Sequence, residues 1–539
     1  MKNSILFKSL VVLTVFTAFV ACQQEKKKVI NFPTTDLKAE NFVPKPLKII
    51  PTNSAFGLDK NTIIYTSQNA TGFPEVGEFL SEKIKWQTDL DLAVNSSTNT
   101  SAERIIFINQ SDSTAFSSKE GYDLHITQDS IILNAKTAEG AFRGVQTIRQ
   151  IIPETSNDTL SENKMWLIPT GKIIDNPNFE YRGSMLDVAR HFFSVEDVKK
   201  YIDILAYYKI NILHLHLADD QGWRIEIKSW PKLTEIGGSS EVGGGPGGFY
   251  TQEEYKDIVA YAAKHYITIV PEIDMPGHTN AASVSYPILN GNGKTPKIYT
   301  GTEVGFSTFD TRKDTVYAFI DDVVREISAI TPGPYFHAGG DESHVTKKKD
   351  FIHFVSKVDK IVKKYGKKMI GWDEIVHADI DTSAIAQFWA NEENAKLAVE
   401  KGLKIILSPG KKAYLDMQYD TLSKYGLHWA GYIPVDTGYI WTPERYVKGI
   451  NKENILGVEA PLWSETISNM EELEYLAFPR MIGYSELSWS VEENRNWENY
   501  KVRLGNQAPY LDKMNVKYYP SELIDWKKSK YTYKTIDKD

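Results

Sequence analysis

Residues 210–272 contain the pattern that decides the fold: INILHLHL at 210–217, TQEE at 251–254 and ITIVPE at 267–272. The first and last of these segments are short, apolar and rich in β-branched residues, as is typical of buried strands. Between them, Thr251 and Glu254 have the spacing of a capping box, which marks the start of a helix. A strand, a helix and a second strand in this order predict parallel pairing through a right-handed crossover.

The same order recurs through residues 177–539, which we expect to form one large domain. The strand candidates are residues 183–188, 210–217, 267–272, 335–338, 368–372, 384–389, 403–407 and 456–462, with further helical stretches at 311–330 and 395–401. Eight such units close into an α/β structure, the (β/α)8 or TIM barrel. A doubly wound open sheet is the alternative, but no G-x-G-x-x-G motif opens a helix after a first strand. The glycine-rich segment 237–248 precedes a helix without a Lys-Ser/Thr pair, so we interpret it as a mobile loop.

Residues 47–176 alternate short strand-like runs with helical patterns. The strand candidates are residues 63–65, 104–108, 122–126 and 131–133, and apolar residues at helical spacing cover 74–86 and 138–151. This pattern predicts a smaller N-terminal α+β domain that carries no evident chemistry of its own. The turn at Asn176-Pro177-Asn178 is expected to mark the boundary with the barrel.

The beginning of the chain resembles a secretory signal. Lys2 and Lys8 precede the apolar run 10–20, which is too short for a membrane-spanning helix, and the small residue Ala21 follows. Residues 1–21 are therefore expected to be a signal peptide. The position of Cys22 after Ala21 resembles the bacterial lipobox, in which the thiol is acylated and becomes the mature N-terminus. An ordinary signal peptide with an incidental cysteine is the alternative.

Residues 22–46 contain a lysine run at 26–28 and several prolines, and they are predicted to be a solvated tether. Together with the lipobox, this tether predicts a protein that is anchored through Cys22 to a membrane of the bacterial cell envelope. Either the periplasmic or the surface face of the outer membrane is compatible with such an anchor.

Composition excludes several classes of function. The chain has 539 residues, and its 62 Lys and Arg against 70 Asp and Glu leave a net charge of −8 that is spread along the sequence. This distribution offers no basic footprint for nucleic acid. Cys22 is the only cysteine, so an intramolecular disulfide and a multi-cysteine zinc site are both excluded. Aromatic residues reach 12%, and their flat faces suit sugar or base binding as well as core packing.

Polar residues gather where the predicted barrel strands end, which is where barrel enzymes place their chemistry. In chain order these strand ends carry Arg190, Asp219, Asp220, Glu272, Asp274, His278, His337, Asp341, Glu342, Trp372, Asp373, Glu374, Trp389, Tyr414, Asp416, Trp463 and Glu465. Charged groups on one rim are costly without pairing or a polar ligand. The complete ring therefore indicates a ligand site.

The run His337-Ala-Gly-Gly-Asp-Glu342 is the most informative of these segments. In a regular strand Asp341 and Glu342 would point to opposite faces, and only a bend brings both into one cavity. Gly339 and Gly340 permit the dihedrals of such a bend. Two adjacent acids in a semi-enclosed site cannot both ionise freely, so one pKa should rise and supply a proton donor beside an anion. That pair suits the cleavage of a glycosidic bond. A turn with two solvated acids is the alternative.

This run resembles the signature of glycoside hydrolase family 20, the β-N-acetylhexosaminidases. The resemblance covers most of the chain and includes LDVAR at 186–190, HLHLADDQGWR at 214–224, PEIDMPGH at 271–278, GWDE at 371–374, QFW at 387–389, YLD at 414–416 and LWSE at 462–465. It implies that Glu342 is the general acid/base and that Asp341 orients the 2-acetamido group of the substrate. The acetamido oxygen then attacks the anomeric carbon and forms an oxazolinium intermediate.

The resemblance also implies a set of substrate-binding residues. They are Arg190 for sugar hydroxyls; Trp372, Trp389 and Trp463 as pocket walls; Tyr414 for the acetamido oxygen; Asp416 and Glu465 as hydroxyl acceptors; and Asp219 with His278 as a pair that tunes the acid. Core packing is the alternative for each tryptophan, a buried ion pair for Arg190, and a satisfied loop histidine for His278. The segment 343–349 after Glu342 is shorter than in many family members, so the leaving-group side is expected to be more open.

Taken together, these features predict an exo-acting, retaining β-N-acetylhexosaminidase that needs no metal or organic cofactor. Its expected substrate is a glycan or chito-oligosaccharide with terminal N-acetylglucosamine, and N-acetylgalactosamine is the second candidate. One alternative is a metal-dependent barrel hydrolase, because His214 and His216 share a strand face and His278 and His337 could join them. The other is a non-catalytic glycan-binding lipoprotein.

Overall fold

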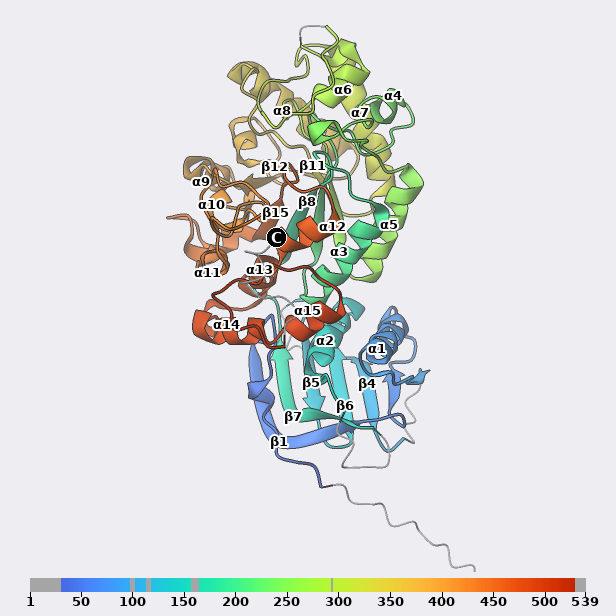
Figure 1. Ribbon diagram of the computed structural model, residues 1–539. Helices are drawn as coiled ribbons and strands as arrows, with labels where there is room; N and C mark the ends of the chain where they lie inside the picture. The colour runs from blue at the N-terminus through green and yellow to red at the C-terminus, as the bar shows by residue number, and fades with distance from the viewer. Residues whose placement is uncertain (1–30, 97–101, 113–117, 157–163, 292–293, 529–539) are drawn as a thin grey trace, which may run out of the picture.

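The computed structural model describes residues 31–96, 102–112, 118–156, 164–291 and 294–528, which form two packed units (Figure 1). The smaller, N-terminal unit is a seven-stranded mixed sheet with the order β1-β7-β5-β6-β4-β2-β3. Its elements are β1 (Lys48–Leu58), β2 (Ile63–Thr66), α1 (Phe73–Thr88), β3 (Val94–Asn95), β4 (Ile105–Gln110), β5 (Tyr122–Ile126), β6 (Ser130–Ala135), α2 (Ala138–Ile151) and β7 (Trp166–Asp175). Figure 1 shows α1 and α2 on the side of the sheet that faces the larger unit.

The larger unit is a closed barrel of eight parallel strands, which confirms the predicted fold class. The strands are β8 (Tyr181–Asp187), β9 (Ile212–His216), β10 (Thr268–Glu272), β11 (Tyr335–His337), β12 (Lys368–Trp372), β13 (Ile385–Phe388), β14 (Lys404–Leu407) and β15 (Ile455–Leu462). Each strand pairs with its neighbour in chain order, and β15 pairs with β8 to close the ring. Between β12 and β13 the connection carries only a short 3-10 helix, Asp373–His377, instead of an α-helix.

Helices connect the barrel strands, and four more, α12 to α15, follow the last strand β15. They are α3 (Val195–Tyr207), α4 (Lys232–Glu235), α5 (Gln252–Lys264), α6 (Asn280–Ser285), α7 (Asp314–Ile330), α8 (Lys348–Lys364), α9 (Glu392–Glu400), α10 (Gly410–Ala413), α11 (Val435–Tyr439), α12 (Met470–Ala477), α13 (Arg480–Trp489), α14 (Trp497–Gly505) and α15 (Ala508–Lys513). The capping box expected at Thr251 and Glu254 is present at the start of α5. The helix expected from residue 311 begins at Asp314, because residues 310–313 form a turn in which Lys313 N–H donates to Asp310 O.

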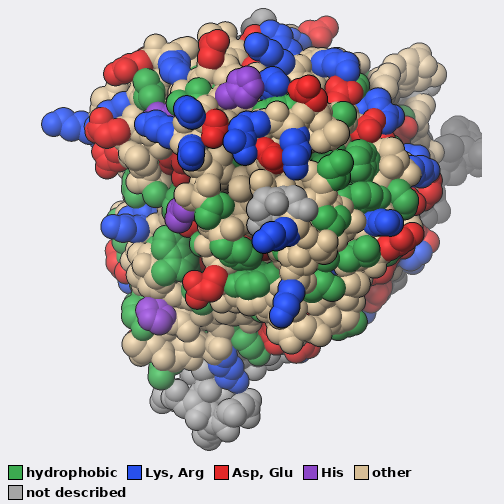
Figure 2. All heavy atoms as spheres, turned by 90° about the horizontal axis from the view of Figure 1, so that it is seen from above, with side chains coloured by type: hydrophobic (Ala, Val, Ile, Leu, Met, Phe, Trp, Pro, Cys, Tyr) green, Lys and Arg blue, Asp and Glu red, His purple; other side chains and the backbone are tan. Residues whose placement is uncertain are grey.

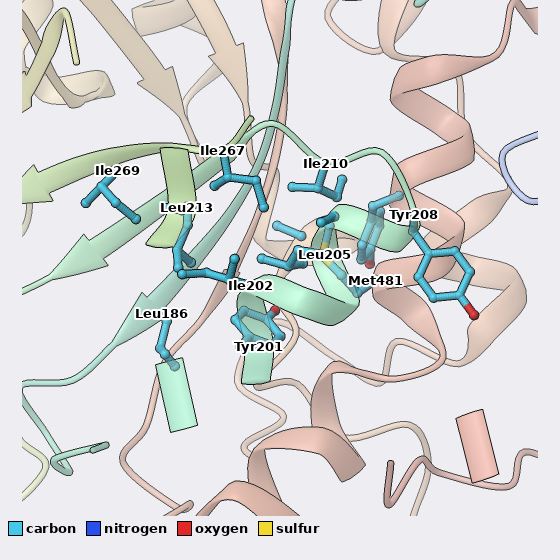
Figure 3. Close-up of a cluster of buried hydrophobic side chains, with 14 of the residues drawn as sticks. Leu186, Tyr201, Ile202, Leu205, Tyr208, Ile210, Leu213, Ile267, Ile269 and Met481 are labelled. Carbon is cyan, nitrogen blue, oxygen red and sulfur yellow. The ribbon is translucent and has the colours of Figure 1, made fainter. Parts of the chain in front are cut away.

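The first barrel helix shows how the core is built. Ser194 and Asp197 cap α3 reciprocally, so the chain enters the helix in a defined direction. The apolar face of α3 then packs its side chains against the outer faces of the barrel strands (Figure 3). In Figure 3 Ile202 and Leu205 of α3 lie beside Leu213 of β9 and Ile210 before it. These side chains are at most 1% exposed, and burying each one contributes about 1.5–3 kcal/mol to folding.

The prediction of a solvated tether up to residue 46 is wrong for residues 36–46. Leu37, Phe42 and Val43 are buried at 2% exposure or less. The backbone of this segment also exchanges hydrogen bonds with both units: Val43 N–H donates to Gln150 in the small unit, and Lys45 N–H donates to Glu486 in α13. The sequence pattern of lysines and prolines does not show these contacts, because the partners lie more than 100 residues away. Cys22 and the predicted signal peptide lie outside the described residues.

The surface of the protein mixes charges. On the face shown in Figure 2, basic and acidic side chains intermix, most densely in its upper part, and neither sign forms a patch of its own. Among the helices of the described residues, none combines the length and the apolar character that crossing a bilayer requires.

Candidate functional site

A sharp bend after β11 brings the two adjacent acids into one cavity, as the sequence predicts. Gly339 and Gly340 have φ values of 64° and 106°, and Glu342 follows with a φ of 41°. A Cβ atom on Gly339 would lie 1.8 Å from Asp274 Oδ1, so only glycine fits at this position. The bend is secured by a hydrogen bond from Gly340 N–H to Asp274 Oδ1 at 3.0 Å.

The cavity lies at the carboxyl ends of the barrel strands and has a volume of about 250 Å³. Its lining residues are Arg190, Thr302, Val304, Asp341, Glu342, Trp389, Tyr414, Asp416, Leu427, Trp429, Trp463 and Glu465. Most of the predicted catalytic and substrate-binding residues therefore line this one cavity. Asp219, His278 and Trp372 are not in the lining and lie behind it. Thr302, Val304, Leu427 and Trp429 were not predicted, because they belong to long loops whose sequence carries no strand-end signal.

Glu342 is the partly exposed acid of the pair, and its side chain is 30% exposed. Burial, reinforced by the neighbouring Asp341 carboxylate, raises the pKa of Glu342 above its ordinary value. His278 Nε2 lies 3.8 Å from Glu342 Oε2 and 3.7 Å from Asp341 Oδ2. A carboxyl group with a raised pKa in contact with a cavity holds the proton that an acid catalyst must deliver.

His278 is held in place by Asp219. The Nδ1 atom of His278 lies 3.2 Å from Asp219 Oδ1, and Arg190 Nη2 lies 2.8 Å from Asp219 Oδ2. Burial alone would lower the pKa of His278, but Asp219 and Asp341 raise it well above its ordinary value. Burial would likewise raise the pKa of Asp219, but Arg190 and His278 hold it well below its usual range. The loop histidine is thus a buried cation between a permanent anion and the two adjacent acids.

Asp341 offers an acceptor that the protein itself does not use. Its Oδ1 atom is buried and has no hydrogen-bond partner within the described residues. Asp274, which supports the bend, is fully buried; burial and the Asp341 charge raise its pKa well above the ordinary value. Asp341 therefore stands between a neutral carboxyl group and the His278 cation, with one oxygen left for a donor on a ligand.

The opposite wall of the cavity is lined with unpaired carboxylate oxygens. Both oxygens of Asp416 and the Oε2 atom of Glu465 are buried without a hydrogen-bond partner within the described part of the chain. Burial raises the pKa of both groups, and their proximity raises that of Asp416 further. Arg190 contributes a donor on this side: its Nε atom is unpartnered, while its Nη atoms pair with Asp187 and Asp219. This wall suits a ligand that carries several hydroxyl groups.

Aromatic rings form the remaining walls. Trp463 is 9% exposed in the lining, with the Arg190 guanidinium 4.9 Å from its ring. The rings of Tyr414 and Trp463 are 6.4 Å apart, and Trp372 packs behind them at 5.7 Å from Trp463. Trp372 is only 1% exposed, and its Nε1 donates to Glu272 at 3.1 Å. It therefore supports the Trp463 wall from behind and does not face the cavity. Trp429 differs from all of these, since 58% of its surface is exposed at the rim.

The histidines of the barrel interior lie against buried acids. His214 lies 2.9 Å from Glu459 Oε1 and 3.0 Å from Glu272 Oε2, so both of its ring nitrogens face carboxylates. Although burial lowers it, these two acids raise the pKa of His214 to about 9, and that of His216 is raised well above its ordinary value. His337 joins this network, since its Nδ1 lies 2.8 Å from Glu272 Oε1. The three interior histidines thus share buried carboxylates below the cavity.

Comparison with known proteins agrees with this geometry. The family model described as glycosyl hydrolase family 20, catalytic domain, matches residues 179–492, and the model for domain 2 of the same family matches residues 39–176. A β-N-acetylhexosaminidase of Cellulomonas fimi is 38% identical over 410 residues, 76% of this chain and 82% of that protein. A β-hexosaminidase of Porphyromonas gingivalis is 34% identical and covers 93% of this chain and 67% of its own length.

Solved structures resemble most of the chain. The GH20 β-N-acetylhexosaminidase of Streptomyces coelicolor superposes with a TM-score of 0.85 and 41% identity, covering 90% of this chain and 99% of that one. A mutant β-hexosaminidase of Streptomyces plicatus, in complex with its product GlcNAc, gives a TM-score of 0.86 and 41% identity over 93% of this chain and 100% of its own.

Proposed function

The chain belongs to glycosyl hydrolase family 20, and on this premise we propose that the protein is an exo-acting β-N-acetylhexosaminidase. The observation that carries the proposal is the entry of Asp341 and Glu342 into one cavity of about 250 Å³. Asp416, Glu465 and Arg190 line the same cavity. A cavity of this volume beside the two acids suits a single terminal sugar, so cleavage would release one residue at a time.

In the mechanism that we propose, the substrate supplies its own nucleophile. The acetamido N–H donates to the unpartnered Oδ1 of Asp341, which turns the acetamido oxygen toward the anomeric carbon. That oxygen forms a bond to the anomeric carbon while the glycosidic C–O bond breaks, and Glu342 gives its proton to the leaving oxygen. The positive charge that spreads over the resulting oxazolinium ring is balanced by Asp341.

Water completes the cycle on the same face of the sugar. Glu342, now ionised, removes a proton from a water molecule, whose oxygen attacks the anomeric carbon and reopens the oxazolinium ring. The acetamido group is regenerated and Glu342 is protonated again, so no atom of the enzyme is consumed. Two displacements at one carbon retain the β configuration. No step requires a metal or an organic cofactor.

The binding walls support terminal N-acetylglucosamine as the substrate, with N-acetylgalactosamine as the second candidate. The unpaired oxygens of Asp416 and Glu465 would accept hydrogen bonds from ring hydroxyls, and Tyr414 and Trp463 would enclose the acetamido side. The exposed Trp429 at the rim would contact the next sugar of a glycan or chito-oligosaccharide.

The test is hydrolysis of a chromogenic nitrophenyl N-acetyl-β-glucosaminide, followed by NMR identification of the first-formed anomer. We expect β-N-acetylglucosamine as the first product and strong inhibition by a thiazoline analogue of the oxazoline. Glu342→Gln should be folded and almost inactive. Binding of N-acetylglucosamine without any hydrolysis would indicate the non-catalytic glycan-binding alternative, and a first-formed α-anomer would contradict the substrate-assisted mechanism.

We also propose that the protein is lipid-anchored through Cys22 at a bacterial cell envelope. The support is the sequence alone: Lys2 and Lys8, the apolar run 10–20, and Cys22 after a small residue. Since Thr35 Oγ1 donates to Ser54 O and residues 36–46 pack on the folded body, the residues before Thr35 are left to serve as the linker. Radiolabelled palmitate should enter the wild-type protein and not Cys22→Ala. Equal labelling of the two would contradict the anchor.

A further inference from the structure

Two buried arginines outside the cavity, Arg224 and Arg480, bind backbone carbonyls next to substrate-facing residues. Arg224 is fully buried and Arg480 is 1% exposed. Neither guanidinium has a carboxylate hydrogen-bond partner within the described residues, and both direct their N–H groups at backbone carbonyls. Burying a guanidinium without a counter-ion is costly, so an arginine satisfied in this way is retained for the geometry that it imposes.

Arg224 holds the segment that ends in Arg190. Its Nε donates to Val188 O at 3.1 Å and to Ala189 O at 3.2 Å, and its Nη2 donates to Ala189 O at 2.6 Å. The remaining donors reach the glycine-rich loop at the carbonyls of Gly238, Ser240 and Gly248. That loop in turn bonds the next residue, since Val242 N–H donates to Arg190 O at 2.9 Å. The segment 237–248, expected to be a mobile loop, is therefore tied to the wall that carries Arg190.

Arg480, the first residue of α13, holds the loop that follows β14. Its Nη2 donates to Leu415 O at 2.6 Å, and its Nη1 donates to Met417 O at 2.7 Å and to Ile433 O at 3.0 Å. The two carbonyls at 415 and 417 flank Asp416, whose side chain lines the cavity. The guanidinium also stacks on Tyr419 at 3.8 Å. One side chain thus anchors the loop that carries Tyr414, Asp416 and Trp429.

We propose that Arg224 and Arg480 are positioning residues, each of which fixes one wall of the sugar cavity through the carbonyls beside its substrate-facing residue. The expected effect on kcat/KM rests on the proposed function. That the two arginines hold the cavity walls in place follows from these contacts alone. Neither arginine is in the lining of the cavity, so each acts through the backbone of Arg190 or of Asp416. Lysine keeps the charge but cannot reach the same carbonyls, because its ammonium lacks the planar fork.

The experiment compares Arg224→Lys and Arg480→Lys with a matched control, Arg182→Lys. Arg182 is also fully buried and donates to the carbonyls of Phe179 and Lys209; it differs in pairing with Glu120 as well, and it lies at the amino end of β8, against the small unit. All three variants should lose stability. After correction for folded fraction, we expect kcat/KM for the nitrophenyl substrate to fall at least about tenfold in the two wall variants and to stay within about twofold in the control.

Hydrogen exchange gives a second readout that does not depend on activity. Amide exchange should rise around residues 188–191 and 238–248 only in Arg224→Lys, and around residues 415–433 only in Arg480→Lys. Kinetic losses no larger than that of Arg182→Lys, or exchange that rises evenly over the barrel, would overturn the proposal. An inactive wild-type enzyme would contradict the proposed function instead, and the exchange pattern would still decide whether the two arginines position the walls.

Discussion

The Nε2 atom of His278 lies 3.8 Å from Oε2 of Glu342, close enough for the histidine charge to act on the acid and too far for a hydrogen bond. Because Asp219 and Asp341 keep His278 protonated, Glu342 faces a cation on one side and an acid on the other. Burial and Asp341 raise the pKa of Glu342, whereas His278 lowers it. The acid strength of Glu342 is thus a balance between opposing neighbours.

Removing the His278 charge should move this balance in a defined direction. In His278→Gln the lowering influence is lost, so the pKa of Glu342 rises and the acid stays protonated to higher pH. We expect the alkaline limb of the kcat/KM profile to shift to higher pH. The maximum of kcat/KM should fall, because the Glu342 side chain is no longer held in place by His278. The measurement is kcat/KM from about pH 4 to 9.

The matched control for this variant is His265→Gln. His265 is 7% exposed and lies 3.1 Å from Asp203 at the outer side of the barrel, remote from the cavity. Its replacement should leave the position of the alkaline limb unchanged. An alkaline limb that stays in place in His278→Gln would show that His278 does not act on Glu342.

Replacing Asp341 with asparagine should separate catalysis from folding. Asp341→Asn keeps the shape but loses the anion that orients the acetamido group, so kcat should fall by about 10²–10³-fold. Stability should not fall, because a buried charge beside Asp274 is removed. Steady-state kinetics and thermal unfolding test both claims, with the exposed Asp379→Asn as the surface control. Near wild-type turnover in Asp341→Asn would contradict the assigned role.

Sequence patterns identified the barrel because its evidence is local. The buried strand β9 and the capping box of α5 follow from neighbouring residues alone, and so does the bend at Gly339 and Gly340. The strands β1 and β7 were not predicted. Pro51 lies within β1, beside a shift in the register with β7. Because proline cannot donate a hydrogen bond to a neighbouring strand, it is tolerated only in an edge strand such as β1, and in the sequence it argues against a strand.

Contacts between distant residues were beyond the reach of local patterns. The packing of Phe42 and Val43 depends on Arg503 and Gln150, whose positions only the fold determines. The same holds for the rim, where Trp429 reaches the cavity from a loop with no strand or helix signal. The long-range pair of Asp219 and His278 was expected only through resemblance to a family, and the structure places the two residues in contact.

Truncation of Trp429 should affect substrates longer than one sugar. The side chain is 58% exposed and contacts the rings of Tyr414 and Trp389 edge-on at 5.8 and 6.3 Å. Loss of one aromatic contact corresponds to about 0.5–1.5 kcal/mol, so Trp429→Ala should raise KM for chito-oligosaccharides by about two- to tenfold. Thermal stability should hardly change, since little of the side chain is buried.

The control for the rim is Trp86→Ala. Trp86 is 38% exposed on α1 of the small unit and should leave KM unchanged for every substrate. The comparison uses initial rates with chitobiose and with longer chito-oligosaccharides. Equal KM values for wild type and Trp429→Ala on all of these substrates would mean that the leaving sugar does not contact the rim.

The junction between the two units depends on Glu120. Its carboxylate accepts hydrogen bonds from Arg143 Nε at 2.8 Å and Arg182 Nη1 at 3.0 Å, both fully buried. Burial alone would raise the pKa of Glu120, but the two arginines lower it from 4.5 to about 2. Glu120→Ala leaves the buried Arg182 without its hydrogen-bonded anion and Arg143 with only Glu139 at 3.6 Å, so the free energy of unfolding should fall by about 3–5 kcal/mol. Activity at moderate temperature should persist, because the cavity lies at the other end of the strands.

The pH dependence of this loss has a fixed sign. A carboxyl group whose pKa is lower in the folded state contributes stability above its unfolded value, and this contribution disappears as pH falls through the folded value. The difference in unfolding free energy between wild type and Glu120→Ala should therefore be full above pH 4.5 and shrink as pH falls toward about 2. Glu82→Ala, which removes an exposed acid paired with Lys83, serves as the control and should cost less than about 1 kcal/mol at any pH. A Glu120→Ala loss as small as that of the control, or one that grows on acidification, would show that the anion does not join the two units.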